Sequence, residues 1–207
     1  TETTCRPKDC GLYTITLNKD YNSFDVFINN GEILDNNANE NFSISKKQKA
    51  LSANDMFTDF DYRNIGLGTC LHLVNVIEML ENNLDKIELY SIPSAMLFHM
   101  KFGFVPNCIW DSETKFNLKA ISMDSNFPEY SNSAKKLLNS HLLTKKMKEK
   151  RANKIFLDYL NEAHKIYPKE ERIIPKSLDM VLSKKSVLEN KDFYNELFKK
   201  YHIDYEI

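Results

Sequence analysis

The stretch DYRNIGLGTC, residues 61–70, places two of the chain's five glycines two positions apart in a protein of 207 residues. Glycine loses more conformational freedom on folding than any other residue, so a glycine-poor sequence uses it where the backbone requires it. The following segment, TCLHLVNVIEMLENN (69–83), carries apolar side chains at helical spacing, with Thr69 placed to cap its start. The sequence therefore predicts a turn with a bare backbone at Gly66 and Gly68 that leads into a helix.

The segments around this turn alternate in type. Upstream, LYTITL (12–17) and FDVFI (24–28) have the composition of strands, and the polar stretch 29–43 is interpreted as a loop. Downstream lie a buried strand at KIELYSI (86–92), a short helix at SAMLFHMKFG (94–103) and a strand at FVPNCIW (104–110). Strand, glycine turn, helix, strand, helix and strand in this order predict an α/β fold that contains a parallel pairing.

Residues 125–207 differ from the rest of the chain in net charge and in the spacing of their apolar residues. Residues 1–124 contain 11 Lys or Arg against 17 Asp or Glu, whereas residues 125–207 contain 17 against 12, and the whole chain has a net charge of −1. Helical spacing runs through 133–167 and returns within 176–201, without any glycine. We expect two parts: an α/β domain over 1–124 and an all-helical C-terminal extension over 125–207.

Composition excludes several classes of protein. With 42% hydrophobic and 28% charged residues the chain resembles an ordinary globular protein, and no apolar run approaches the roughly 20 residues of a membrane-spanning helix. The start, TETTCRPKDCGLYTI, has no basic segment followed by an apolar one, so no secretory signal is predicted. A cytoplasmic location is expected, and delivery of the protein into a host cytoplasm is the alternative.

The cysteines predict no metal site. Cys5, Cys10, Cys70 and Cys108 are scattered and lack the paired spacing of a zinc knuckle. Free thiols in a reducing compartment are expected.

The glycine turn has the features of an anion site. The first N–H groups of a helix have no partner within it, and the helix dipole adds positive potential at the same place. Arg63 adds a charge beside the turn. Two common phosphate loops do not fit, because no Gly-Lys-Ser/Thr follows Gly66 and Leu71 stands where a dinucleotide fingerprint needs its third glycine.

The order Arg63-x-x-Gly66-x-Gly68 resembles the pyrophosphate loop of the GNAT superfamily of acyl-CoA-dependent N-acetyltransferases. The segment AMLFHMKFGF (95–104) is similar to the superfamily's next helix, which usually reads A-I-x-L-Y-x-K-L-G-F. The resemblance is clear over residues 50–110, plausible over 11–49 and nearly absent over 111–207. It implies a GNAT-like mixed, splayed β-sheet flanked by helices.

The resemblance also implies acetyl-CoA as a co-substrate, with no metal. The strand before the loop, about 53–60, then parts from the strand after the helix, and its backbone pairs with the pantetheine arm. The pyrophosphate lies on the loop and the start of the helix. The cofactor-binding residues implied in this way are Met56, Phe57, Thr58, Arg63, Asn64, Ile65, Gly66, Leu67, Gly68 and Thr69.

In GNAT enzymes a neutral amine attacks the thioester directly in a ternary complex. The tyrosine that usually protonates the departing thiolate is replaced here by His99, which is either the proton donor or a buried structural residue. Ile92 stands where the family often has asparagine. The candidates for the base are Asp55 and Asp59, on the strand before the loop.

The basic run KKLLNSHLLTKKMKEKRANK (135–154) has eight basic residues, one acidic residue and no aromatic residue. A solvated helix face is expected there, rather than a nucleic-acid or membrane surface. Two alternatives to an enzyme stay open: a catalytically impaired GNAT-fold module that binds CoA or a partner, and an adaptor that acts through 135–154. The expected partner is an amine acceptor, a small molecule or a protein, and a homodimer is left open.

Overall fold

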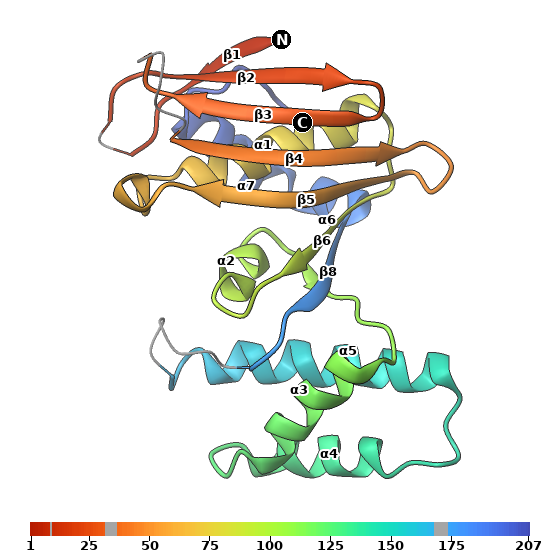
Figure 1. Ribbon diagram of the computed structural model, residues 1–207. Coiled ribbons are helices and arrows are strands. Elements are labelled where there is room, and N and C mark those ends of the chain that lie inside the picture. Colours follow the sequence, from red (N-terminus) through yellow and green to blue (C-terminus); the bar gives the residue numbers. More distant parts are fainter. Residues whose placement is uncertain (9, 32–36, 168–173) are drawn as a thin grey trace. The chain divides into compact units, whose positions relative to one another are not determined.

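The computed structural model describes residues 1–8, 10–31, 37–167 and 174–207 (Figure 1). Eight strands are hydrogen-bonded in the order β1-β2-β3-β4-β5-β6-β8-β7, with helices beside them. This open, mixed α/β arrangement confirms the predicted fold class. The chain forms two compact units, one of Thr1–Glu88 with Ser183–Ile207 and the other of Leu89–Leu182.

An antiparallel meander forms most of the first unit. Its strands are β1 (Glu2–Cys5), β2 (Tyr13–Asp20), β3 (Ser23–Asn29), β4 (Ala38–Ser45) and β5 (Ala50–Thr58). Side chains alternate between buried and half-buried along β3 and β4, the period of a sheet with one covered face. Phe24 and Phe42 stack across these strands with their ring centroids 4.7 Å apart.

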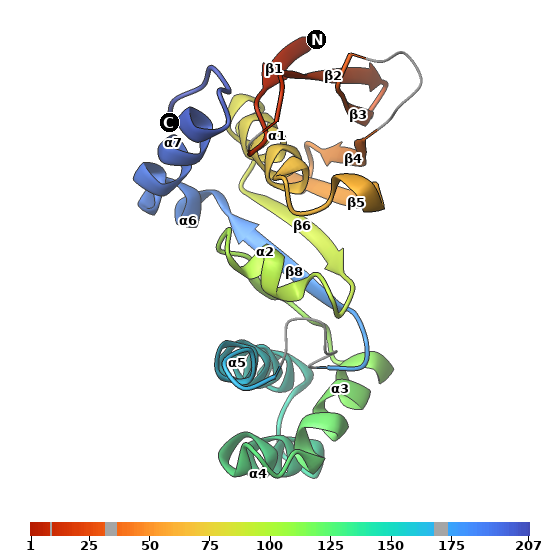
Figure 2. The ribbon, with the colours of Figure 1, turned by 90° about the vertical axis from the view of Figure 1, so that its left-hand side faces the viewer.

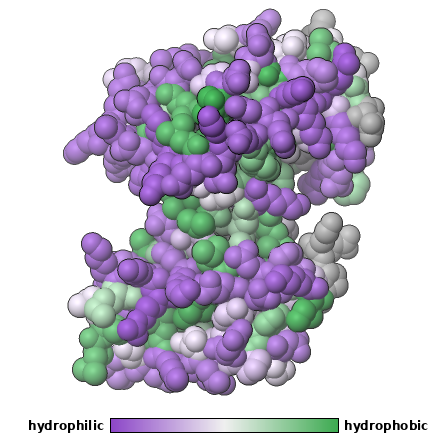
Figure 3. Space-filling view, turned by 180° about the vertical axis from the view of Figure 1, so that it is seen from behind, coloured by the Kyte–Doolittle hydropathy of each residue, from purple (hydrophilic) through white to green (hydrophobic). Residues whose placement is uncertain are grey.

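The helix α1 (Leu67–Glu81) covers one face of this meander. Figure 2 shows α1 between the sheet and α7 (Lys191–Lys200), and α6 (Lys184–Glu189) lies beside them. Because α1 has neighbours on opposite sides, its apolar residues are buried around much of its circumference. The surface on the side of these helices is mainly hydrophilic, with a small apolar patch (Figure 3).

The second unit contains the remaining helices. These are α2 (Met96–Met100), α3 (Ser112–Met123), α4 (Pro128–Leu138) and α5 (Lys145–Ala163). The short β7 (Val105–Pro106) pairs antiparallel with β8 (Leu178–Ser183), and β6 (Lys86–Ser91) and β8 each carry residues of both units. Asn153 of α5 accepts a hydrogen bond of 2.8 Å from the Cys108 N–H, which ties α5 to the chain after β7.

The structure differs from the sequence prediction in several places. The predicted loop 29–43 contains the start of β4 at Ala38, while its residues 32–36 lie outside the described part of the chain. Residues 125–207 are predicted to be all-helical, but LDMVLS forms β8, where Leu178, Met180 and Leu182 are buried in the alternating pattern of a strand. The helix α3 has no counterpart in the prediction.

The predicted boundary after residue 124 falls between α3 and α4, inside the second unit. Division of the chain into a domain of 1–124 and an extension of 125–207 stays a prediction. None of the described helices combines the length and the apolar character needed to cross a membrane.

Candidate functional site

The predicted glycine turn lies in the first unit, where β5 ends and α1 begins. After Thr58 the chain forms one 3-10 turn, Phe60–Tyr62 (η1), and Asp59 caps this turn by accepting a hydrogen bond of 3.2 Å from the Asp61 N–H. Asn64 and Gly66 then take φ angles of 67° and 110°, in the left-handed region. This pair of left-handed residues turns the chain so that α1 begins at Leu67, with Gly66 as its N-cap. Gly68 and Thr69 lie in the first turn of the helix, so the prediction that Thr69 caps its start is wrong.

The first N–H groups of α1 are available to a ligand. Cys70 is the first residue to bond inside the helical turn, through its N–H to the Gly66 carbonyl at 3.1 Å. Within the described residues, no group accepts a hydrogen bond from the N–H of Leu67, Gly68 or Thr69, and Gly66 provides no side-chain cap. Gly68 and Thr69 are half-buried, so this end of the helix is not sealed. Unpaired N–H groups and the helix dipole together favour an anion here.

Tyr201, at the end of α7, packs directly on Gly66. A Cβ atom on Gly66 would lie 2.4 Å from the ring carbon Cε1 of Tyr201 and 2.6 Å from its hydroxyl oxygen. Together with the φ of 110°, this contact accounts for glycine at position 66 without any ligand. Direct contact of Gly66 with a phosphate stays a prediction.

Both ends of the chain hold the turn in place. The Lys8 N–H donates to the Ile65 carbonyl at 2.8 Å, and the Arg6 N–H donates to the Tyr201 carbonyl at 2.7 Å. The N-terminal segment thus bonds to the turn and to the residue that covers it. These backbone bonds position the start of α1 independently of the long side chains.

Cations and carboxylates both surround the turn. The Arg63 guanidinium lies 5.3 Å from the centroid of the exposed Phe60 ring, and its Nε donates weakly to the Thr58 carbonyl at 3.4 Å. The Lys200 ammonium lies 5.8 Å from the centroid of the Tyr201 ring. Asp61 is exposed beside Arg63 and partly offsets this positive charge.

The predicted residues of β5 lie at its C-terminal end, next to the turn. Met56 is opposite Glu40 in the register with β4, Thr58 is opposite Ala38, and Phe57 is 50% exposed. Of the two predicted bases, Asp55 is exposed on β5, while Asp59 is half-buried and caps η1. The structure therefore brings both carboxylates to the segment that leads into the turn, and their catalytic roles stay predictions.

His99 lies on α2 in the second unit and is only 7% exposed. Its ring contacts those of Phe98 and Phe104, with centroids 5.4 and 5.9 Å away. Burial lowers the pKa of His99 to about 4, because the charged ring loses its water. At neutral pH the imidazole is therefore uncharged and a poor proton donor, which favours the structural alternative left open by the sequence.

One buried acidic residue of the first unit has no counterpart in the sequence prediction. Glu40 of β4 is 2% exposed, and its Oε1 accepts a hydrogen bond of 2.6 Å from Nδ2 of the fully buried Asn75 of α1. Burial raises the pKa of Glu40 to about 8, although the hydrogen bond from Asn75 opposes the shift. The only local signal is that Glu40 takes the place of an apolar residue between Ala38 and Phe42, which is visible once β4 is recognised as a strand.

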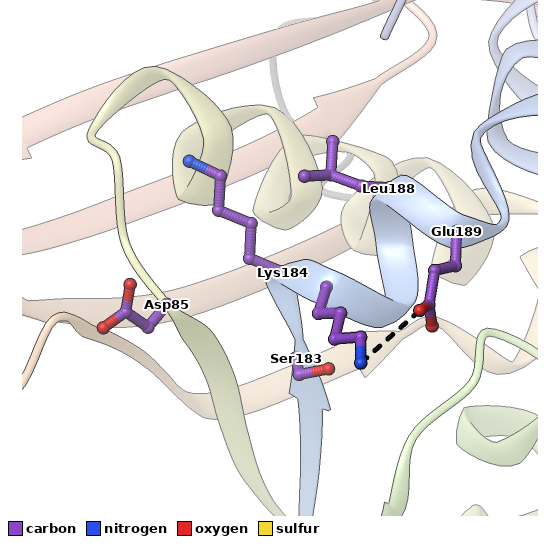
Figure 4. Close-up of a pocket in the computed structure, with 6 residues that line it drawn as sticks. Asp85, Ser183, Lys184, Leu188 and Glu189 are labelled. Atoms are coloured by element: carbon purple, nitrogen blue, oxygen red, sulfur yellow. Dashed lines mark ion pairs between the residues drawn. The ribbon is translucent and has the colours of Figure 1, made fainter.

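A separate hollow at the start of α6 contains mixed charges (Figure 4). The Lys184 ammonium donates to Asn83 at 2.7 Å, and Lys185 forms an ion pair of 3.6 Å with Glu189. Lys185 therefore has a carboxylate partner, whereas Lys184 is bonded to a neutral amide and keeps its positive charge.

No protein-family model and no curated protein matches the sequence. Solved structures of similar fold include the spermidine/spermine N-acetyltransferase SpeG from Vibrio cholerae, at 10% identity over 83% of this chain and 72% of that chain, with a TM-score of 0.45. A Bacillus subtilis acetyltransferase in complex with CoA has 11% identity over 82% of this chain and 97% of its own, with a TM-score of 0.45. Tetrahymena GCN5 has 19% identity over 42% of this chain, with a TM-score of 0.38.

This chain covers 53% of the length of Tetrahymena GCN5 and 54% of a GNAT-family acetyltransferase from Staphylococcus aureus. At these identities the likeness concerns the fold. The chain is thus similar in fold to acetyltransferases of the GNAT family.

Proposed function

We propose that this protein is an acyl-CoA-dependent N-acetyltransferase, which transfers an acetyl group from acetyl-CoA to an amine by direct attack in a ternary complex. The observation that supports this proposal is that the N–H groups of Leu67, Gly68 and Thr69, at the start of α1, have no acceptor among the residues that the structure describes. They lie beside Arg63, on a turn that both ends of the chain hold in place. A diphosphate is the kind of anion that such backbone donors bind.

The residues of the first unit have separate roles in this proposal. The N–H groups at the start of α1 bind the diphosphate, and the backbone of Met56 to Thr58 pairs with the pantetheine arm. The co-substrate supplies an activated thioester when it is bound. Asp55 is exposed near the same end of β5, so its carboxylate is accessible to an amine or to a water molecule that relays the proton.

Coenzyme A binding is tested by placing a charge at Thr69. An acidic residue in the first turn of a helix interacts favourably with the helix dipole, so Thr69→Glu should fold normally while it repels a diphosphate. Thr69→Gln has nearly the same shape without the charge and serves as the control. We expect Thr69→Glu to weaken CoA binding more than about tenfold relative to Thr69→Gln in isothermal titration calorimetry, at equal melting temperature. Absence of CoA binding by the wild-type protein at millimolar CoA would overturn the proposal.

Turnover is tested by following the release of free thiol from acetyl-CoA with a panel of polyamines, aminoglycosides and peptides. Release that depends on both the amine and the protein is expected. The second candidate function is a CoA-binding module without turnover, which the buried and uncharged His99 favours. For this module, CoA would raise the melting temperature while no amine in the panel released thiol.

The structure gives no comparable support to an adaptor that acts through 135–154. In α5 of this run, Lys145 pairs with Glu149 at 3.9 Å, and Lys154 pairs with Asp158 at 2.9 Å. Such pairs between successive turns are typical of a solvated helix surface.

A further inference from the structure

The hydroxyl group of Tyr201 lies at the start of α1, where the unpaired N–H groups are. Its oxygen is 2.6 Å from the position that a Cβ atom on Gly66, the N-cap of α1, would occupy. Tyr201 as a whole residue is only 7% exposed. Within the described part of the chain, no protein group forms a hydrogen bond with this hydroxyl. The hydroxyl oxygen is not among the fully buried polar atoms that lack a partner, so it keeps some contact with solvent although the ring is buried. An anion at the start of α1 can therefore reach this hydroxyl and accept a hydrogen bond from it.

We propose that Tyr201 binds the diphosphate of CoA, with its hydroxyl donating a hydrogen bond to a phosphate oxygen that the N–H groups of α1 also contact. This inference rests on the proposed function, because it assigns a further residue to the same site. It adds a side-chain donor from the C-terminal segment to a site otherwise built from backbone donors.

Backbone contacts fix the position of Tyr201 at the turn. Its N–H closes the last turn of α7 on Leu197 at 2.9 Å, and its carbonyl accepts the bond from Arg6. His202 follows with a φ of 56°, and the Ile203 N–H returns to the Phe198 carbonyl at 3.0 Å, which ends the helix in a left-handed turn. The hydroxyl is therefore held beside α1 before any ligand arrives, and its use requires little loss of side-chain freedom.

The charge around Tyr201 suits the same ligand. The Lys200 ammonium lies 5.8 Å from the centroid of the Tyr201 ring, on the preceding residue of the chain. A cation close to a phenol donor favours an anionic oxygen as the acceptor over a neutral one.

The test compares Tyr201→Phe with the wild-type protein in isothermal titration calorimetry with CoA and with dephospho-CoA, which retains the diphosphate but lacks the 3′-phosphate. A hydrogen bond to a charged group is worth enough to predict that Tyr201→Phe binds both ligands about 10- to 100-fold more weakly. Tyr205→Phe is the matched control, since the Tyr205 hydroxyl donates to Glu81 at 2.9 Å in the same C-terminal segment. Its affinity for CoA should stay within about twofold of the wild type.

Each outcome has a distinct meaning. If the wild-type protein does not bind CoA, the proposed function fails and this inference fails with it. If the wild type binds CoA and Tyr201→Phe binds it equally well, this inference alone fails. Weaker binding of CoA with unchanged binding of dephospho-CoA would assign the hydroxyl to the 3′-phosphate and overturn the diphosphate contact.

A second measurement covers the case in which Tyr201→Phe is unstable. Wild-type protein labelled with fluorotyrosine is titrated with inorganic pyrophosphate and, separately, with pantetheine. The fluorine resonance of Tyr201 should move with pyrophosphate and not with pantetheine, and a resonance that moves with neither would overturn the inference.

Discussion

Glu40 and Asn75 form a buried hydrogen bond of 2.6 Å that joins β4 to α1, the helix that starts at the candidate site. The other oxygen of Glu40 and the amide oxygen of Asn75 are both buried, and no group within the described residues bonds to either. With its pKa raised to about 8, the carboxyl group of Glu40 is mostly protonated at neutral pH. In the protonated form the carboxyl group has one O–H donor, and it still accepts the hydrogen bond from Asn75.

The first prediction concerns the pH dependence of stability at Glu40. The folded pKa of about 8 lies above the ordinary value of 4.5, so between these values the folded state keeps a proton that the unfolded state loses. The contribution of Glu40 to the free energy of unfolding therefore falls as pH rises through this window, and it levels off above the folded pKa. We compare the free energy of unfolding of Glu40→Gln with that of the wild type in urea unfolding at two pH values. The difference in favour of Glu40→Gln should be larger at pH 8 than at pH 5, by up to a few kcal/mol. Glu2→Gln, at an exposed site, is the control. If the free energies of unfolding of Glu40→Gln and the wild type differ by the same amount at both pH values, Glu40 is not protonated in the folded state.

The second prediction concerns Gly66. Replacement by alanine should lower the free energy of unfolding by about 2 kcal/mol or more, because the φ of 110° is strained for alanine and its Cβ would overlap Tyr201. Gly11→Ala is the control, because a Cβ there meets no atom within 4 Å. The double variant Gly66→Ala with Tyr201→Ala should be less destabilised than the sum of the two single variants. Additive losses in urea unfolding would show that the ring contact does not determine the choice of glycine.

The third prediction concerns His99. Its folded pKa of about 4 lies below the ordinary value of 6.5, so between these values the unfolded state binds more protons and stability falls as pH falls. In His99→Phe the free energy of unfolding should no longer fall in this way, a fall that amounts to up to about 3 kcal/mol near pH 4 in the wild type. The rate of thiol release should also be unchanged between pH 6 and 9. A tenfold or larger fall in that rate, with an altered pH profile, would identify His99 as the proton donor instead.

The fourth prediction separates the two candidate bases. Asp55 is exposed, and at position 59 asparagine can cap η1 as aspartate does, so Asp55→Asn and Asp59→Asn should both fold normally. The variant that removes the base should lower kcat of thiol release about 100-fold or more and leave the Kd for CoA unchanged. Equal kcat in both variants and the wild type would exclude both carboxylates from this role.

Much of the fold around the site follows from local sequence patterns. The helical spacing after Thr69 predicts α1, and the β-branched and aromatic runs predict β2, β3 and β6. The strand β8 was missed because its alternating pattern in LDMVLS is only six residues long and is followed directly by helical residues. The strand β4 was missed because asparagine-rich composition suggests a loop, whereas pairing with β3 and β5 on both edges overrides that preference.

Left-handed backbone at a glycine and apolar spacing along a helix are local properties, so the sequence alone determined the turn at Gly66 and the helix after it, although Gly68 lies inside that helix and not in the turn. The closure of that turn by Tyr201, and the protonation of Glu40, depend on residues far apart in the chain that meet only on folding. Which side chain covers Gly66 depends on how the surrounding residues pack. Whether the carboxyl group of Glu40 keeps its proton depends on how far the surrounding residues exclude water. Packing and the exclusion of water are set by the whole fold and not by the residue at one position.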